Sequence, residues 1–185
     1  MADSEVSLRD DMTLDYVVRV EDVPPTGRDA SFEVPEEMCT TLTQRFGVTK
    51  LEALNVEARL VPLDKECLHV TGTVRGRVEQ ICGVTLEPMW TDITQSFSAE
   101  FQPESMVAKF VIPEDDFETD LPEALQDGAA NIGELAIQVF AMEIPAYPRK
   151  DGVAFDAGSA GVERADSPFS VLAGFHKAST GNDDT

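Results

Sequence analysis

The chain has 185 residues, of which 42% are hydrophobic, and its 14 Lys and Arg against 35 Asp and Glu give a formal net charge of −21. This length allows one domain with a hydrophobic core, with or without tails. Such an excess of acids repels nucleic acid at long range and attracts basic proteins. Every apolar run is shorter than the ~18 residues of a membrane span, so we expect no membrane protein.

Cysteine content and the N-terminus together predict a cytoplasmic protein. Cys39, Cys67 and Cys82 are odd in number and widely spaced, which favours reduced thiols over a disulfide framework. Residues 1–12 are polar and lack the basic start and apolar centre of a signal peptide. We expect residues 1–12 to be disordered.

The first elements follow from hydrophobic periodicity. Alternating apolar residues predict a strand over Thr13–Val20, and a proline-rich loop follows at 23–27. A helix is predicted over Phe32–Phe46, because Pro35 suits a first helical turn and Gly47 is a suitable stop.

The clearest strand of the chain covers residues 67–82. Its alternation predicts one apolar face, formed by Leu68, Val70, Val74, Val78 and Cys82. Gly72 and Gly76 lie on that face, where they leave room for a neighbour or mark a bulge. Leu51–Val61 alternates too, and the short connection between these two strands predicts an antiparallel hairpin.

Two further strands, Thr91–Phe101 and Met106–Ile112, complete a predicted antiparallel meander. Residues 113–127 carry seven acids, which indicate a solvated acidic loop. A metal site is the alternative, although the spacing differs from that of a calcium loop.

A second helix is predicted from Asn131, which can cap it while Glu134 reaches back as in a capping box. The predicted fold class is α+β, with an antiparallel β meander or partly closed sheet covered by two or three helices. We expect it to form a single domain over residues 13–149, followed by a flexible C-terminal segment.

That C-terminal segment divides into three predicted parts. Residues 150–166 indicate a linker, residues 167–178 a short helical motif, and residues 179–185 a disordered tail. The motif has four apolar residues, Phe169, Val171, Leu172 and Phe175. They can dock in the groove of a partner or pack on the chain's own sheet, and the sequence leaves both open.

Four basic side chains share the outward face of the predicted hairpin: Arg59, His69, Arg75 and Arg77. They form either an ordinary charged strand surface or a contact for a phosphate backbone or an acidic partner. No aromatic residue is predicted on this face, which weakens the case for stacking single-stranded RNA.

Catalytic and metal-binding patterns are not found in the sequence. Cys82 has Thr85, not a second cysteine, three residues later, and we expect Cys82 to be a core residue. A Cys–His dyad and a glycine-rich phosphate loop have no support. The sequence therefore predicts a protein that is not an enzyme, with no catalytic residues, cofactor or metal.

Three segments together carry a resemblance to a known family. The first runs from Cys82 to Pro88, the second is the Asn131 helix with Pro145 and Pro148 at its end, and the third is the Ser167-Pro-Phe motif. They resemble the YceD-like family, bacterial proteins linked to accumulation of large-subunit (23S) ribosomal RNA. The variant here resembles the alphaproteobacterial branch. Thr85 stands where the family has its second cysteine, which puts any metal role in doubt.

The resemblance implies a cytoplasmic, non-catalytic factor in ribosome biogenesis. Its expected partner is large-subunit ribosomal RNA, a basic ribosomal protein or another assembly factor. One alternative is an acidic adaptor between proteins that never touches RNA. A further alternative is a metal-dependent ribonuclease, which would need the acids of residues 113–127.

Overall fold

The computed structural model describes residues 5–110 and 121–154. The chain divides into two units, Met1–Asp151 and Gly152–Thr185, and the fold below is that of the first unit. The predicted C-terminal helix and tail lie outside the described residues, as does most of the predicted acidic loop. Within the described ranges, no helix is long and apolar enough to cross a membrane.

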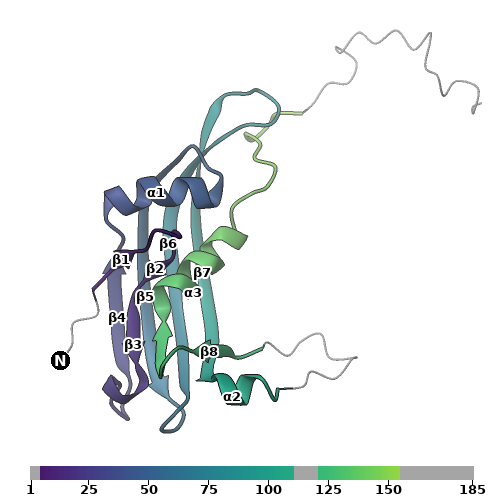
Figure 1. The fold of residues 1–185 in the computed structure, drawn as a ribbon. Helices are drawn as coiled ribbons and strands as arrows, with labels where there is room; N and C mark the ends of the chain where they lie inside the picture. The colour runs from purple at the N-terminus through teal and green to yellow at the C-terminus, as the bar shows by residue number, and fades with distance from the viewer. Residues whose placement is uncertain (1–4, 111–120, 155–185) are drawn as a thin grey trace, which may run out of the picture. The chain divides into compact units, whose positions relative to one another are not determined.

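A five-stranded sheet forms the body of the first unit (Figure 1). Neighbouring strands are antiparallel, except that β7 and β8 run parallel. In sheet order the strands are β4 (Arg28–Glu33), β5 (Lys50–Pro62), β6 (Leu68–Ile81), β7 (Pro88–Pro103) and β8 (Glu123–Leu125). The predicted α+β class and the antiparallel meander are thus confirmed.

Two helices, α1 (Glu36–Phe46) and α3 (Ile132–Met142), cross the same face of this sheet (Figure 1). Helix α1 packs on β5, and α3 packs on β6 and β7. The core lies between the helices and the sheet, and its fully buried members include Leu42, Leu54, Val56, Leu60, Val70, Val74, Val78, Ile137 and Phe140. Since both helices use one face, the opposite face of the sheet, here called the open face, carries polar side chains.

Two glycines of β6 allow this close packing. A Cβ atom on Gly76 would lie 2.7 Å from a ring carbon of Phe140 and 2.7 Å from the carbonyl oxygen of Ala53. A Cβ atom on Gly72 would lie 2.5 Å from a ring carbon of Phe97. All three distances are far below van der Waals contact, so the aromatic rings rest directly on the backbone of β6. The expected room for a neighbour is filled by these rings.

Short strands near the N-terminus form two small ladders. β1 (Ser7–Leu8) pairs with β2 (Leu14–Asp15), and β3 (Val17–Arg19) pairs with β9 (Ala129–Asn131). The predicted disorder of residues 1–12 is therefore wrong where β1 forms, because that stretch gains ladder bonds. A 3₁₀ turn, Val20–Asp22, follows β3.

Other element boundaries also differ from the predictions. The residues at the start of the predicted helix, Phe32 and Glu33, belong to β4, since Phe32 is needed in the core beside Tyr16. The predicted strand Met106–Ile112 is wrong over residues 106–110, because β7 ends at Pro103 and a helical turn, α2 (Glu104–Val107), starts there. Proline has a backbone geometry suited to beginning a helix.

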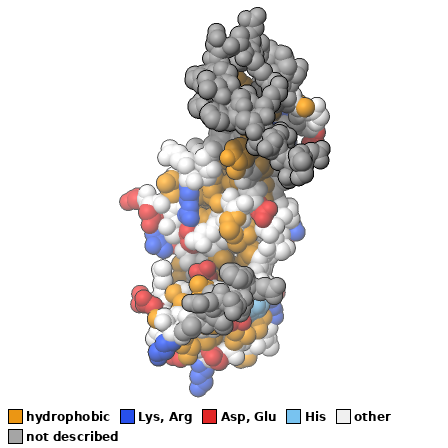
Figure 2. Space-filling model, turned by 90° about the vertical axis from the view of Figure 1, so that its right-hand side faces the viewer, with side chains coloured by type: hydrophobic (Ala, Val, Ile, Leu, Met, Phe, Trp, Pro, Cys, Tyr) orange, Lys and Arg blue, Asp and Glu red, His pale blue; other side chains and the backbone are white. Residues whose placement is uncertain are grey.

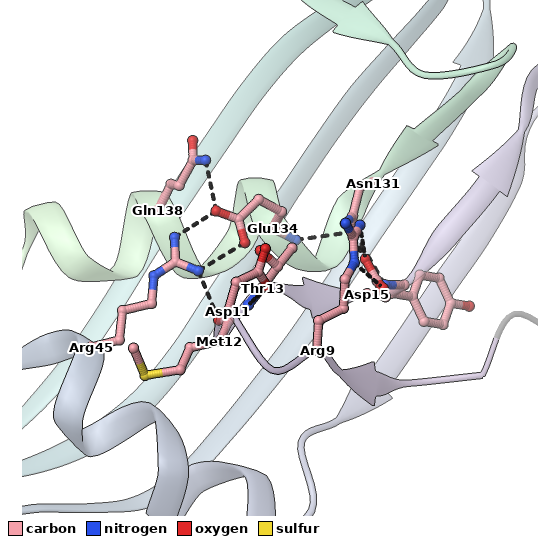
Figure 3. Close-up of polar contacts among 10 residues, drawn as sticks. Arg9, Asp11, Met12, Thr13, Asp15, Arg45, Asn131, Glu134 and Gln138 are labelled. Atoms are coloured by element: carbon pink, nitrogen blue, oxygen red, sulfur yellow. Dashed lines mark hydrogen bonds and ion pairs between the residues drawn. The ribbon is translucent and has the colours of Figure 1, made fainter.

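A polar network ties the N-terminus to both helices (Figure 3). The Asn131 side-chain oxygen accepts the Glu134 N–H at 3.2 Å, which confirms the predicted cap, and the Tyr16 N–H at 3.2 Å. The Glu134 carboxylate does not complete a capping box; it accepts two hydrogen bonds from Arg45 of α1, at 2.9 Å and 2.5 Å. Arg9 pairs with Asp15 at 2.6 Å.

Candidate functional site

The open face holds all four basic residues singled out in the sequence. Arg59 lies on β5, and His69, Arg75 and Arg77 lie on β6. The register sets Arg59 opposite Thr71, and Arg75 opposite Asn55, so the arginines are spread over several rows and do not form one cluster. Their function as contacts stays a prediction.

Each arginine of this face is paired with a carboxylate. The ion pairs are Arg59–Asp29 at 3.0 Å, Arg75–Glu57 at 3.3 Å, Arg77–Glu52 at 3.4 Å and Arg77–Asp92 at 3.4 Å. Exposed pairs of this kind add at most about 1 kcal/mol to stability. These ion pairs have a larger effect on the electrostatic potential of the open face, because they cancel the positive charge that would attract a phosphate backbone.

Trp90 is the functional candidate that the sequence analysis missed. It lies at the start of β7, opposite Glu79 of β6, on the open face. The Arg77 guanidinium carbon lies 5.1 Å from its ring centroid and the Lys50 ammonium 5.8 Å, both within cation–π range. The predicted strand began at Thr91, three residues after the start of β7. Continuing its alternation back from Asp92 places Trp90 on the same face as Asp92.

Between the arginines, the open face is lined with hydroxyl groups. The register sets Thr71 opposite Ser98 and Thr73 opposite Ser96. The Thr73 and Ser96 hydroxyl oxygens lie 3.4 Å apart. This part of the face is therefore small-chained and uncharged, with Trp90 as its large side chain near one end.

The four family-motif residues meet at one end of the sheet. Cys82 follows β6 and Pro88 begins β7, so that the two flank the hairpin turn. The carbonyl oxygen of Pro145 accepts a hydrogen bond from the Gln80 side chain at 2.9 Å. The carbonyl oxygen of Pro148 accepts one from the Gly83 N–H, also at 2.9 Å. Two segments that lie far apart in the sequence thus form one structure.

The Cys82 side chain is fully covered, at 0% exposure, but it is not part of the hydrophobic core cluster. The pKa of Cys82 is lowered to about 6 by hydrogen bonds from the Thr85 hydroxyl and from the N–H groups of Thr85, Lys150 and Val84. Burial acts in the opposite direction and has the smallest effect. The Lys150 nitrogen lies 3.4 Å from the sulfur. Cys82 is buried as predicted, but in a polar turn that favours the thiolate.

This turn offers one sulfur ligand and no second one. Thr85 contributes a hydroxyl that donates to the Cys82 sulfur. Among the residues that the structure describes, no group of three or more His, Cys, Asp or Glu could hold a metal ion. The other two cysteines, Cys39 and Cys67, are buried elsewhere, and burial raises the pKa of each thiol.

The sequence model of the family described as "Large ribosomal RNA subunit accumulation protein YceD" matches residues 70–175. The chain belongs to this family, as the resemblance predicted. The match begins within β6 and includes the Cys82 turn, β7 and α3. The family's description links its members to large-subunit ribosomal RNA and names no reaction.

The other comparisons add no relatives. No curated protein matches the chain significantly, and no solved structure does.

Proposed function

We propose that this protein supports the accumulation of large-subunit ribosomal RNA by binding a basic protein, such as a ribosomal protein or an assembly factor, and without catalysing a reaction. The family's description supplies the link to ribosomal RNA. The observation that favours a protein partner is the pairing of every open-face arginine with a carboxylate.

Charge supports the same choice of partner. From Val78 to Pro148 the sequence has one base, Lys109, and fourteen acids. A surface of this kind repels phosphate groups and draws in Lys- and Arg-rich chains. RNA contact by Arg59, His69, Arg75 and Arg77 would first require breaking the ion pairs that three of them make.

One observation favours a second candidate, direct binding of an unpaired RNA base. Trp90 is 36% exposed and is flanked by Arg77 and Lys50, the combination that stacks bases in single-strand binding proteins. In the protein-binding proposal the same residues form a contact point, since Trp and Arg dominate interface energies. Phe169, Val171, Leu172 and Phe175 remain a proposed second docking segment.

Deletion and crosslinking test the proposal. We expect a deletion strain to have less large-subunit than small-subunit ribosomal RNA, and purified chain crosslinked in native extract to be joined to a basic large-subunit protein. A normal ratio of the two RNAs would contradict the proposal. Crosslinks to RNA bases at Trp90, with none to protein, would favour the second candidate.

Variants of the open face sharpen this test. Trp90→Ala should reduce rescue of the deletion strain, because it removes the largest exposed side chain of the face. Gln44→Ala, an exposed change on α1, serves as the matched control on the opposite side of the sheet. Equal rescue by both variants would exclude the open face as the contact.

A further inference from the structure

One long edge of the sheet has no partner strand among the described residues. β6 pairs with β7 along its inner edge, from Ile81↔Pro88 to Leu68↔Phe101. On the outer edge, β8 pairs only with residues 101–103. The outer edge of residues 88–100, here called the β7 edge, is therefore unpaired in this part of the chain.

The hydrogen-bonding groups of the β7 edge can be assigned. The Cys82 N–H donates to the Glu87 carbonyl at 2.9 Å, so the backbone of Glu87 faces β6. In an antiparallel ladder successive residues alternate between facing the partner and facing away. The register of β6 and β7 shows no shift, so the outward-facing N–H groups belong to Trp90, Asp92, Thr94, Ser96 and Ser98.

Native sheets protect free edges with proline, lysine, bulges or very short strands. The β7 edge has none of these devices between Met89 and Gln102. Its centre, residues 93–99, carries no charge at all. An edge of this length and composition is suited to accepting another strand.

A depression runs around the same edge, lined from both faces of the sheet. His69 and Glu100 contribute from the open face, and Leu135 and Met142 from α3. Met142 is 77% exposed, and Phe110, which also lines this depression, is 40% exposed. Figure 2 views the side of the molecule on which β7 lies and shows hydrophobic side chains gathered in patches along it.

The charges at this edge are acidic on its open-face side. The Asp92 side chain is 83% exposed and is met only by Arg77, at 3.4 Å, among the described residues. Glu100 lies at the other end, opposite His69. Seen along β7, one side of the edge is acidic and hydroxyl-lined, while the α3 side is apolar.

We propose that the β7 edge accepts an extended segment of the partner protein as an additional strand, and that this segment alternates basic and apolar side chains. Backbone pairing would supply affinity, and alternate side chains would supply specificity. Basic side chains would face Asp92 and Glu100, and apolar ones would rest on Leu135 and Met142. The inference builds on the proposed function, which requires a basic protein partner.

Trp90 provides the measurement, because it is the only tryptophan of the chain and lies on the β7 edge. Full-length protein is titrated with a peptide of about ten residues that alternates Lys and Val, roughly the length of the edge. We expect a shift of Trp90 emission that saturates, and no saturable shift with the matching Glu–Val peptide. Equal responses to both peptides would overturn the proposal.

Ser96→Pro tests the pairing itself. It removes an outward-facing N–H and leaves the β6 ladder intact, so folding should survive. Affinity for the Lys–Val peptide should fall about tenfold or more, through the lost bond and the clash of the ring. Ser31→Pro on β4, the opposite edge of the sheet, is the matched control, and Met142→Ser should weaken binding without touching the backbone.

Other occupants of the edge give different outcomes. If amide hydrogen exchange in the free protein is already slow at the outward-facing N–H groups of Asp92, Thr94, Ser96 and Ser98, the chain's own residues or a second copy cover the edge, and the proposal fails. If Ser96→Pro changes the sedimentation of the free protein, the occupant is a second copy, and the proposal also fails. Equal peptide affinity of Ser96→Pro and Ser31→Pro would overturn it as well.

The failure of this inference is distinguishable from that of the proposed function. If folded Ser96→Pro restores ribosomal RNA in the deletion strain as well as wild type does, the edge is not used and the proposed function stands. If the deletion strain has normal ribosomal RNA, the proposed function fails, whatever the peptide titration gives.

Discussion

The thiol of Cys82 lies among hydrogen-bond donors of its own turn and of the segment that follows α3. A sulfur in such a turn is stabilised as a thiolate by short-range dipoles alone. Thr85 contributes both a hydroxyl and an N–H, and its hydroxyl is the largest single contribution. Thr85 is therefore the residue of this turn that most strongly favours the thiolate form of Cys82.

Replacing Thr85 by Val should raise the pKa of Cys82 from about 6 toward the usual 9.0, because the hydroxyl donor is lost. Thiolate absorbance of a variant that lacks Cys39 and Cys67 measures this directly. A Cys82 pKa unchanged in Thr85→Val would mean that the backbone donors suffice.

The Cys82 thiolate also makes stability depend on pH. Because the folded pKa lies below the unfolded one, the stabilisation is complete above pH 9.0 and is lost as the pH falls through about 6. The unfolding free energy should therefore rise between these two pH values, and this rise should disappear in Cys82→Ser. Urea unfolding across that range gives the measurement.

The Glu134 carboxylate is paired with the Arg45 guanidinium, and this pair makes stability depend on pH in a second, more acidic range. Burial raises the pKa of Glu134, but hydrogen bonds from Arg45 and Gln138 and the Arg45 charge outweigh it, so the pKa lies below its usual 4.5. The stabilisation is present above pH 4.5 and is lost as the pH falls through the folded pKa. Glu134→Gln should cost about 1–2 kcal/mol at neutral pH and flatten the acid side of the stability curve, whereas Glu143→Gln, an exposed change at the opposite end of α3, should do neither.

At the scale of elements, β6 determines how closely α3 can approach the sheet. Gly76→Ala places a methyl group against Phe140 and against a backbone oxygen that cannot move. We expect a loss of about 1–3 kcal/mol in unfolding free energy, the usual cost of overpacking. Gly83→Ala is the control, since its nearest neighbour would lie 3.7 Å away; equal losses in urea unfolding would contradict this account.

Periodicity predicted the long strands because half-buried strands of ten or more residues repeat the same signal many times. It failed on the short ones: β4 shows only Ala30 and Phe32 as inward residues, and β8 has three residues in all. Helix α3 was found through Asn131, a local cap signal. The strand predicted over Met106–Ile112 was wrong over residues 106–110 because the apolar residues after Pro103 begin in a helical turn.

Only part of the candidate site could be predicted from the sequence. Alternation placed Arg59, Arg75 and Arg77 on one face of the sheet. Their acid partners lie on neighbouring strands, and the sequence of one strand does not determine its register with the next, so the ion pairs could not be predicted. The bond from Lys150 to Cys82 spans 68 residues, so no local pattern could reveal it. The free edge of β7 needed the strand order of the whole sheet.

For the whole molecule, a net charge of −21 acts against folding through self-repulsion. Raising sodium chloride from about 10 mM to about 150 mM shortens the Debye length from about 30 Å to about 8 Å. The melting temperature should therefore rise over this range, and scanning calorimetry will measure it. A fall would mean that the surface ion pairs outweigh the repulsion.

The ladder of β3 and β9 has a consequence for the order in which the protein folds. Val17 pairs with Asn131, and Tyr16 donates to the Asn131 side chain across 115 residues. During synthesis, β4 to β7 can pair with their sequence neighbours, whereas β3 must wait until residue 131 has left the ribosome. Until then Leu14, Tyr16 and Val18 lack their final cover. A nascent chain of this protein therefore exposes these apolar residues until β9 and α3 have emerged and covered them.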